Sequence, residues 1–151
     1  GTQGNVKEIS LFTTILETID GLYIAAPNSV VWSNNIKNFT RNGRRRMDIV
    51  VGISYSDPID SGLSVLNEIA QSENRLLLDP APQVMVLSMM DSAVNIQLRA
   101  WAKNEDYWAT YWDLNKRVKE AIEQAGLTIP FPQRTLHVVA EKDISALKAP
   151  R

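Results

Sequence analysis

Apolar and β-branched residues fill the first forty positions in short runs. From residue 9 to residue 17 they occupy most odd and even positions alike, so that both faces of an extended segment would be apolar or β-branched. This pattern predicts one strand over residues 9–17. The pair Asp20-Gly21 follows between two apolar stretches and predicts a tight hairpin, because both central positions of such a turn favour positive φ. Residues 26–29 predict a further turn, and short strands are expected over residues 30–32 and 36–40. Three or four strands are too few to close a barrel, so an open edge is expected in this part.

The remainder of the chain changes between a period of two and a period of about 3.6. The expected elements, in order, are a strand over residues 47–55, a helix from Asp57-Pro58 with Asp57 as N-cap, strands over 84–89 and 94–101, a helix over 107–125 ended by Gly126, and a last strand around Leu136 and Val138. This order is β-α-β-β-α-β, the ferredoxin-like arrangement. The chain is therefore predicted to be α+β, with a small, incomplete all-β domain first.

Charge places the boundary between the two parts. Residues 1–46 carry six basic and three acidic side chains, whereas the remainder carries ten and fourteen. The change falls at the basic run over residues 41–46. We expect a β domain over residues 1–43, a ferredoxin-like domain over 44–140 and a loose tail over 141–151.

Composition excludes several classes of site. The net charge of −1 argues against binding nucleic acid through bulk charge, and the absence of cysteine excludes disulfides, thiolate nucleophiles and sulfur-ligated zinc. The single histidine, His137, excludes a multi-histidine metal site and is interpreted as a strand-surface residue. Paired acids are interpreted as helix caps and solvated faces, and the aromatic stripe Trp108, Tyr111 and Trp112 as packing in the core or against a neighbouring subunit. No catalytic residue, metal or cofactor is predicted, and the chain is not expected to be an enzyme.

A series of short motifs runs through most of the chain in a familiar order and spacing. They are Gly4-x-Val6-x-Glu8-Ile9-x-Leu11, Asp20-Gly21, Pro27-Asn28-Ser29, Asn38-Phe39-Thr40-Arg41, Val51-Gly52-Ile53-x-Tyr55-Ser56-Asp57 and Gly126-Leu127-x-Ile129-Pro130-Phe131-Pro132. Through them the sequence resembles the cytoplasmic C-terminal region of the small-conductance mechanosensitive channel (MscS) family, from about residue 4 to residue 139.

The resemblance implies a fold and an assembly. It implies an Sm-like β domain without its first strands, followed by the ferredoxin-like domain. In the family, seven subunits form a hollow vestibule with side portals on the cytoplasmic side of the cell membrane. The chain begins with Gly1 rather than methionine and has no apolar run of membrane-spanning length, so we expect a soluble piece of a larger membrane protein, with its transmembrane helices upstream.

The resemblance also implies a function. Family members open under membrane tension in hypo-osmotic shock, so this region is expected to provide homo-oligomer assembly and solute filtering at the portals. Because the segment between the two domains lies near the portals in the family, the candidate portal or vestibule residues are Arg44, Arg45, Arg46 and Asp48. A different hypothesis stays open: a soluble ferredoxin-like interaction or ligand-sensing module.

Overall fold

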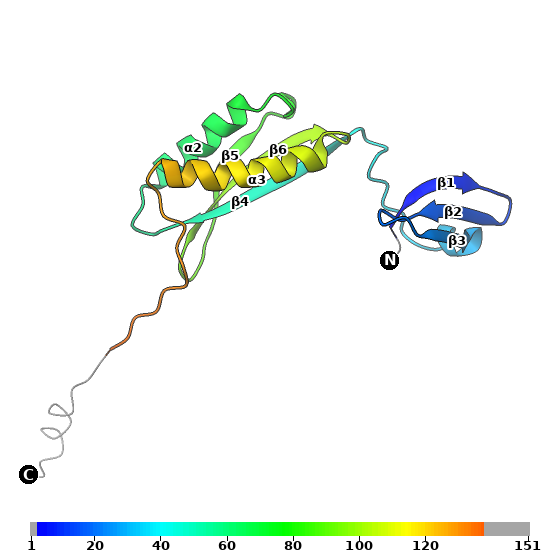
Figure 1. Cartoon of the computed structure of the whole chain (residues 1–151), viewed down its shortest axis with the longest axis horizontal. Coiled ribbons are helices and arrows are strands. Elements are labelled where there is room, and N and C mark those ends of the chain that lie inside the picture. The colour runs from blue at the N-terminus through cyan, green and yellow to red at the C-terminus, as the bar shows by residue number, and fades with distance from the viewer. Residues whose placement is uncertain (1–2, 138–151) are drawn as a thin grey trace, which may run out of the picture. The chain divides into compact units, whose positions relative to one another are not determined.

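The chain forms two compact units, Gly1–Arg41 and Asn42–Arg151, and the computed structural model describes residues 3–137. Each unit holds a three-stranded antiparallel sheet with helical elements, so the fold is α+β as predicted (Figure 1). The two units are described separately below.

The first unit is a meander of three strands followed by one short helix. Its elements are β1 (Asn5–Ile9), β2 (Thr13–Glu17), β3 (Tyr23–Pro27) and α1 (Asn28–Trp32), and β2 lies between the other two strands. The predicted hairpin at Asp20-Gly21 is confirmed, since β2 and β3 pair with Glu17 opposite Tyr23 and Gly21 has a φ of +85°.

The strand predicted over residues 9–17 is in fact two strands. The chain reverses between β1 and β2, where the Ser10 amide donates to the Thr13 carbonyl at 2.8 Å. The Asn28 side chain holds this reversal, because its amide nitrogen donates to the carbonyls of Ser10 and Leu11 at 3.0 and 3.1 Å. Its side-chain oxygen accepts a hydrogen bond of 2.7 Å from the Thr14 hydroxyl.

The strands predicted over residues 30–32 and 36–40 were wrong. Residues 30–32 belong to α1, whose first residue, Asn28, is fixed by the bonds just described. Residues 36–40 form no strand because the Asn38 side-chain oxygen accepts from the amides of Thr40 and Arg41, at 3.0 and 2.9 Å, and bends the chain into a turn. In both places side-chain hydrogen bonds override local strand preference.

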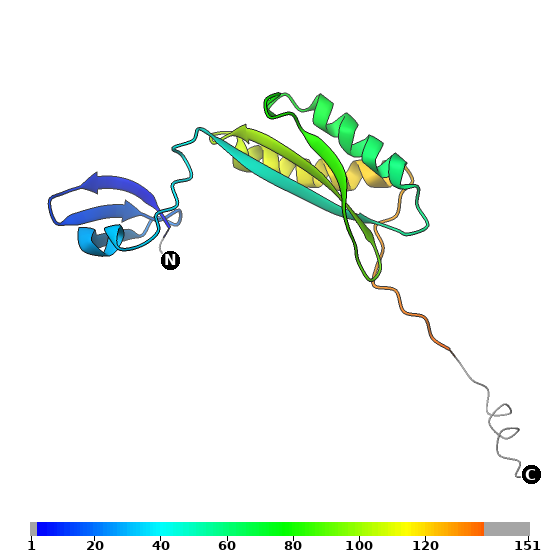
Figure 2. The ribbon, with the colours of Figure 1, turned by 180° about the vertical axis from the view of Figure 1, so that it is seen from behind.

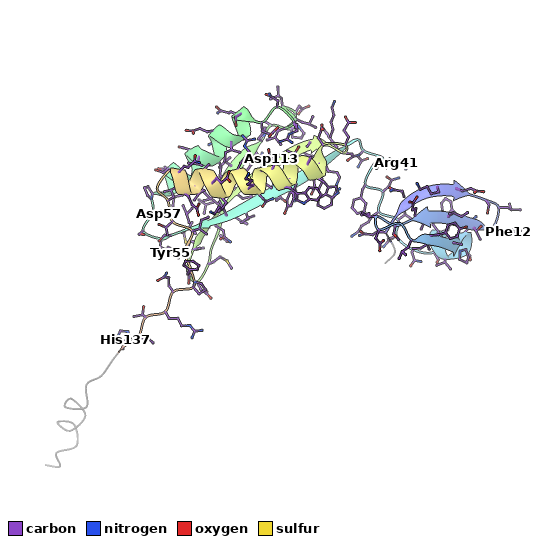
Figure 3. The ribbon with its side chains drawn as sticks, in the orientation of Figure 1. Phe12, Arg41, Tyr55, Asp57, Asp113 and His137 are labelled. Atoms are coloured by element: carbon purple, nitrogen blue, oxygen red, sulfur yellow. The ribbon has the colours of Figure 1, made fainter. Side chains whose placement is uncertain are left out.

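The first unit has almost no core of its own. Among its described residues only Thr14 is buried, and most of its large apolar side chains stand exposed: Val6, Ile9, Leu11, Phe12, Ile19, Leu22, Tyr23, Val30, Trp32, Ile36 and Phe39 (Phe12 is labelled in Figure 3). Its backbone is therefore ordered mainly by strand pairing and by the Asn28 hydrogen bonds.

The second unit has two helices packed on one face of its sheet. Its elements are β4 (Arg44–Ile53), α2 (Ile59–Ser72), β5 (Gln83–Met89), β6 (Val94–Lys103) and α3 (Tyr107–Gln124), and the strand order is β4-β6-β5. The views from front and back agree that α2 and α3 lie on the same side of this sheet (Figures 1 and 2). We call the other side the open face, because no helix among the described residues covers it.

The predicted order β-α-β-β-α is confirmed, but its last strand is not seen. Leu136 and His137 lie in an extended segment that forms no strand, and Val138 lies outside the described residues. His137, expected on a strand surface, instead stands exposed on this segment, away from the sheet (Figure 3).

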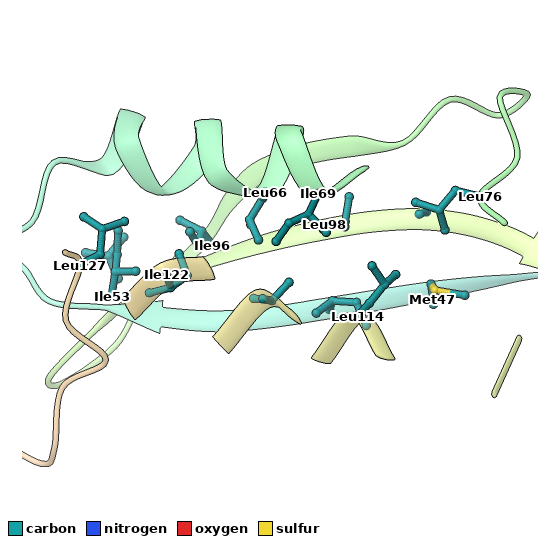
Figure 4. Packing of buried hydrophobic residues seen from close by; sticks show 14 of the residues in the cluster. Met47, Ile53, Leu66, Ile69, Leu76, Ile96, Leu98, Leu114, Ile122 and Leu127 are labelled. Carbon is teal, nitrogen blue, oxygen red and sulfur yellow. The ribbon is translucent and has the colours of Figure 1, made fainter. Parts of the chain in front are cut away.

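Alternate residues of β6 build the core. Its alternate residues Val94, Ile96, Leu98, Ala100 and Ala102 are all buried, and they pack with Met47, Ile49 and Ile53 of β4 against the helices. From α2 come Leu66 and Ile69, and from α3 come Leu114, Val118 and Ile122 (Figure 4). Side chains on an α-helix recur on one face every three or four residues, which is the spacing that these helices show.

The end of α3 agrees with the sequence prediction, whereas the start of α2 does not. Helix α3 ends as expected before Gly126, whose φ of +74° is a conformation that favours glycine. Asp57 was expected to cap α2, but the residue before the helix is Pro58 and no side chain caps it. The Asp57 carboxylate instead accepts a hydrogen bond of 2.6 Å from the Thr128 amide, and the Ser54 amide donates to the Thr128 carbonyl at 2.9 Å. Asp57 therefore fixes the chain leaving α3 to the end of β4 (Figure 3).

A buried carboxylate ties α2 to α3. The Glu73 side chain, 5% exposed, accepts from the Arg75 guanidinium at 2.7 Å and from Arg117 of α3 at 2.8 Å. Arg75 also contacts Asp113 of α3 at 2.7 Å. The hydrogen bonds from Arg75 lower the pKa of Glu73 from 4.5 to about 2 and more than offset the opposing effect of burial.

The Glu73 cluster predicts an acid-sensitive part of the stability. Because the pKa of Glu73 is lower in the folded chain, its stabilisation is present above pH 4.5 and is lost as the pH falls from 4.5 towards 2. We expect Glu73→Gln to lower the free energy of unfolding by about 2 kcal/mol at pH 7 and by much less at pH 3. Urea unfolding followed by tryptophan fluorescence at several pH values measures this difference.

A matched control is Glu123→Gln, on the outer surface of α3, where the exposed carboxylate pairs with Lys119 four residues earlier. Such a pair contributes about 0.5 kcal/mol or less. A deficit for Glu73→Gln that stays constant between pH 7 and pH 3 would contradict the assignment.

Candidate functional site

The four candidate residues lie at the start of β4, and the strand divides them between the two faces of its sheet. Met47 and Ile49 are buried beneath the helices, so Arg45 faces the same side as they do. Arg44, Arg46 and Asp48 face the open side. The sequence-predicted cluster is therefore two groups with different surroundings.

Arg45 lies against the aromatic start of α3. Its guanidinium carbon is 3.8 Å from the centre of the Tyr107 ring and 5.5 Å from that of Trp108. A guanidinium over an aromatic face is attracted by the negative face of the ring, so these contacts hold Arg45 on the helical side.

The aromatic residues of α3 form a continuous surface with Arg45. Trp108 stacks on Trp112 with ring centres 5.6 Å apart, and Tyr111 meets Trp108 edge-on at 6.2 Å. Tyr107 and Tyr111 pack against the core, whereas Trp108 is 47% and Trp112 65% exposed. We call Arg45, Tyr107, Trp108, Tyr111 and Trp112 the aromatic face. The sequence predicted packing of Trp108, Tyr111 and Trp112 in the core or against a neighbouring subunit: Tyr111 packs against the core, whereas the two indoles are exposed in the single chain.

On the open face, Arg44 contacts one residue of β6 and one residue of a loop. Its guanidinium carbon is 5.5 Å from the centre of the Trp101 ring, and Nη1 donates to the Asp79 carbonyl at 3.2 Å. Trp101 belongs to β6, and Asp79 to the loop between α2 and β5. Neither contact involves an acidic side chain.

Asp48 bridges two arginines on the open face. Its Oδ2 accepts from Nη2 of Arg46 at 3.0 Å, and its Oδ1 accepts from Nε of Arg99 at 3.1 Å. Arg99 lies on β6 directly opposite Asp48 in the strand register. The side chains of Asp48 and Arg99 are each 34% exposed, so solvent reaches both. We call Arg46, Asp48 and Arg99 the charge triad.

Sequence reasoning missed Arg99. The alternation over residues 94–101 already assigned Arg99 to the polar side of its strand, but nothing in the sequence fixes which strand pairs with it or in which register. The pairing of β4 with β6 brings together residues 51 positions apart.

Among the described residues, neither a metal site nor a membrane-spanning helix is found. Among residues 3–137, no three His, Asp or Glu side chains are placed to hold a metal ion. Within the same residues, no helix is both long enough and apolar enough to cross a membrane. The features that suggest a function are the charged start of β4 and the aromatic start of α3.

Comparison with known proteins gives a consistent result for both units. A family described as "Mechanosensitive ion channel, beta-domain" matches residues 1–41, and one described as "Mechanosensitive ion channel MscS, C-terminal" matches residues 47–129. The small-conductance mechanosensitive channel of Edwardsiella ictaluri is 38% identical over 91% of this chain and 48% of its own length. The MscMJ channel of Methanocaldococcus jannaschii is 29% identical over 95% of this chain and 41% of its own.

Solved structures support the fold. The closed-state crystal structure of Helicobacter pylori MscS matches with a TM-score of 0.85 at 24% identity, over 91% of this chain and 55% of that one. Arabidopsis thaliana MSL1 matches with a TM-score of 0.71 at 20% identity, over 85% of this chain and 48% of that one. The chain spans about half the length of these relatives.

Proposed function

Because this chain belongs to the MscS family of mechanosensitive ion channels, we propose that it forms the cytoplasmic vestibule of a channel that opens under membrane tension in hypo-osmotic shock. The observation that carries the proposal is the match of two successive family regions to the two units of the chain, in the same order. The membrane-spanning helices belong, in this proposal, to the upstream part of the full-length protein, and the chain lies on the cytoplasmic side of the membrane.

Patch-clamp recording tests this function. The full-length protein that carries this sequence is expressed in cells without mechanosensitive channels of their own, and membrane patches are exposed to graded suction. We expect current that appears above a threshold tension, because tension acts on the membrane-spanning part and the vestibule conducts the released solutes. Absence of tension-activated current, with the protein shown to be in the patch, would contradict the proposal and favour a soluble interaction or ligand-sensing module.

We further propose that the charged start of β4 acts at a side portal of the vestibule. Two of the four sequence-predicted residues, Arg46 and Asp48, face each other on the open face, and Arg44 lies on the same side. Isolated surface charges lose their effect within about 8 Å at physiological salt. Several copies converging on a narrow opening with low-dielectric walls focus the field and favour counter-ions.

Charge reversal at Arg46 tests this filter. Arg46→Glu replaces a cation beside Asp48 by a second anion, so we expect the chloride-to-potassium permeability ratio of the tension-activated current to fall by about twofold or more. Reversal potentials in a salt gradient measure the ratio. Arg45→Glu is expected to act differently, because it breaks the contacts with Tyr107 and Trp108 rather than changing the open face. An unchanged ratio in Arg46→Glu would contradict the filter.

The aromatic face supports assembly of several copies. Two stacked indoles, one of them 65% exposed, and an arginine held over a tyrosine are the residue types that dominate the energy of protein interfaces. The exposed apolar residues of the first unit also require cover that the described chain does not supply. We propose a homo-oligomeric ring, a heptamer in the intact channel, in which the head-to-tail contact between neighbours uses the aromatic face.

Removal of one indole tests the interface. Trp112→Ala takes away the more exposed ring of the stack without touching the buried residues of α3, and we expect it to weaken subunit association by about 2 kcal/mol per interface. Light scattering of the full-length protein in detergent should show loss of the ring in favour of smaller species. Trp112→Phe keeps an aromatic ring and is the matched control. A ring unchanged by Trp112→Ala would place the interface elsewhere.

A further inference from the structure

Arg99, on β6, is the one member of the charge triad that does not belong to β4. Its Nε donates to Oδ1 of Asp48 at 3.1 Å, while Arg46 occupies the other carboxylate oxygen at 3.0 Å. One carboxylate thus faces two guanidinium groups. The triad carries one net positive charge.

We infer that Arg99 is a specificity-determining residue of the proposed filter, because it cancels the charge of Asp48 and makes the open face favour anions. This inference rests on the proposed function and deepens it. Without Arg99 the pair Arg46 and Asp48 is neutral, and an acidic residue at position 48 adds a negative charge to the portal. With Arg99 the triad keeps one net positive charge despite the acidic residue.

The strand register makes this pairing a fixed feature rather than a passing contact. Asp48 and Arg99 are direct cross-strand partners on the same face, flanked in the register by Met47 opposite Ala100 and Ile49 opposite Leu98. All four flanking residues are buried in the core. Because a shift of one residue would expose that core, the register that places Arg99 opposite Asp48 is enforced by burial.

The neighbouring arginines do not take the place of Arg99. Arg44 contacts the Trp101 ring and the Asp79 carbonyl, and Arg45 lies on the helical side over Tyr107. The ion pairs of Asp48 are with Arg46 and Arg99. The charge of Asp48 is therefore balanced by one local arginine and by one from β6.

A set of charge variants in the full-length channel tests the inference by the direction in which each variant changes the ion permeability ratio. Arg99→Gln lowers the net charge of the triad from one positive to zero, and Asp48→Asn raises it to two. We expect the chloride-to-potassium permeability ratio to fall about twofold in the first and to rise about twofold in the second. The double variant Asp48→Asn with Arg99→Gln restores one positive charge, so its ratio should return to that of the wild type. Arg99→Lys retains the charge and should keep the wild-type ratio.

Lys116→Gln is the matched control. It removes one positive charge from the solvent-exposed side of α3, where Lys116 pairs weakly with Glu120 at 3.8 Å. It changes the total charge of the chain as Arg99→Gln does, but it lies on the helical side of the sheet. Its ratio should equal that of the wild type. Tension threshold and current amplitude, recorded in the same patches, show whether each variant still assembles into a channel.

The outcomes separate this inference from the proposals on which it rests. A shift in Arg46→Glu with no shift in Arg99→Gln and Asp48→Asn would overturn the role of Arg99 and leave the filter standing. Shifts of the same sign in Arg99→Gln and Asp48→Asn, or a double variant that does not return to the wild-type ratio, would also overturn it. Unchanged ratios in every variant, with tension-activated current present, would overturn the filter and the role of Arg99 together but not the channel. Absence of tension-activated current would overturn all three.

Discussion

The alternation of side chains along β6 determines which residues of the second unit are buried beneath the helices and which lie on the open face. Five alternate residues of this central strand carry the core, and α2 and α3 cover them. The intervening residues, Arg99 and Trp101 among them, are thereby committed to the open face. A shift of one residue would place charge beneath the helices and apolar side chains in solvent, so the core determines the position of each polar group on the other side.

The same alternation divides the basic run at the start of β4. Consecutive arginines look like one cluster in the sequence, yet a strand sends neighbours to opposite faces. Arg45 therefore contributes to the aromatic face with Tyr107, whereas Arg46 belongs to the charge triad. One short run of sequence thus supplies a residue to a surface suited to packing and another to a surface suited to ions. The two roles can be altered separately because the sheet lies between them.

The sequence was sufficient for features that depend on local pattern. Alternation and helical spacing predicted the strand and helix order of the second unit, and Gly126 predicted the end of α3. Two of the failures involved a side chain whose partner is distant in sequence. Asp57 binds the Thr128 amide instead of capping α2, and Asn28 binds the carbonyls of Ser10 and Leu11.

The candidate site shows the same limit. The residues of the basic run were visible in the sequence, but their separation by face followed only from the strand boundaries, and the partner of Asp48 only from the register. The polar side of β6 was predicted, so Arg99 was already known to face away from the core. What pattern cannot provide is the identity of the strand that pairs with it, because strand pairing depends on the packing of the whole sheet.

The first unit leaves most of its large apolar side chains exposed. Its described residues bury one side chain, Thr14, while eleven large apolar side chains are exposed. These side chains, like the exposed indoles of the aromatic face, are suited to contact with other protein surface. Both units thus have surfaces suited to an assembly, and the folded core of the second unit holds the charge triad in place within it.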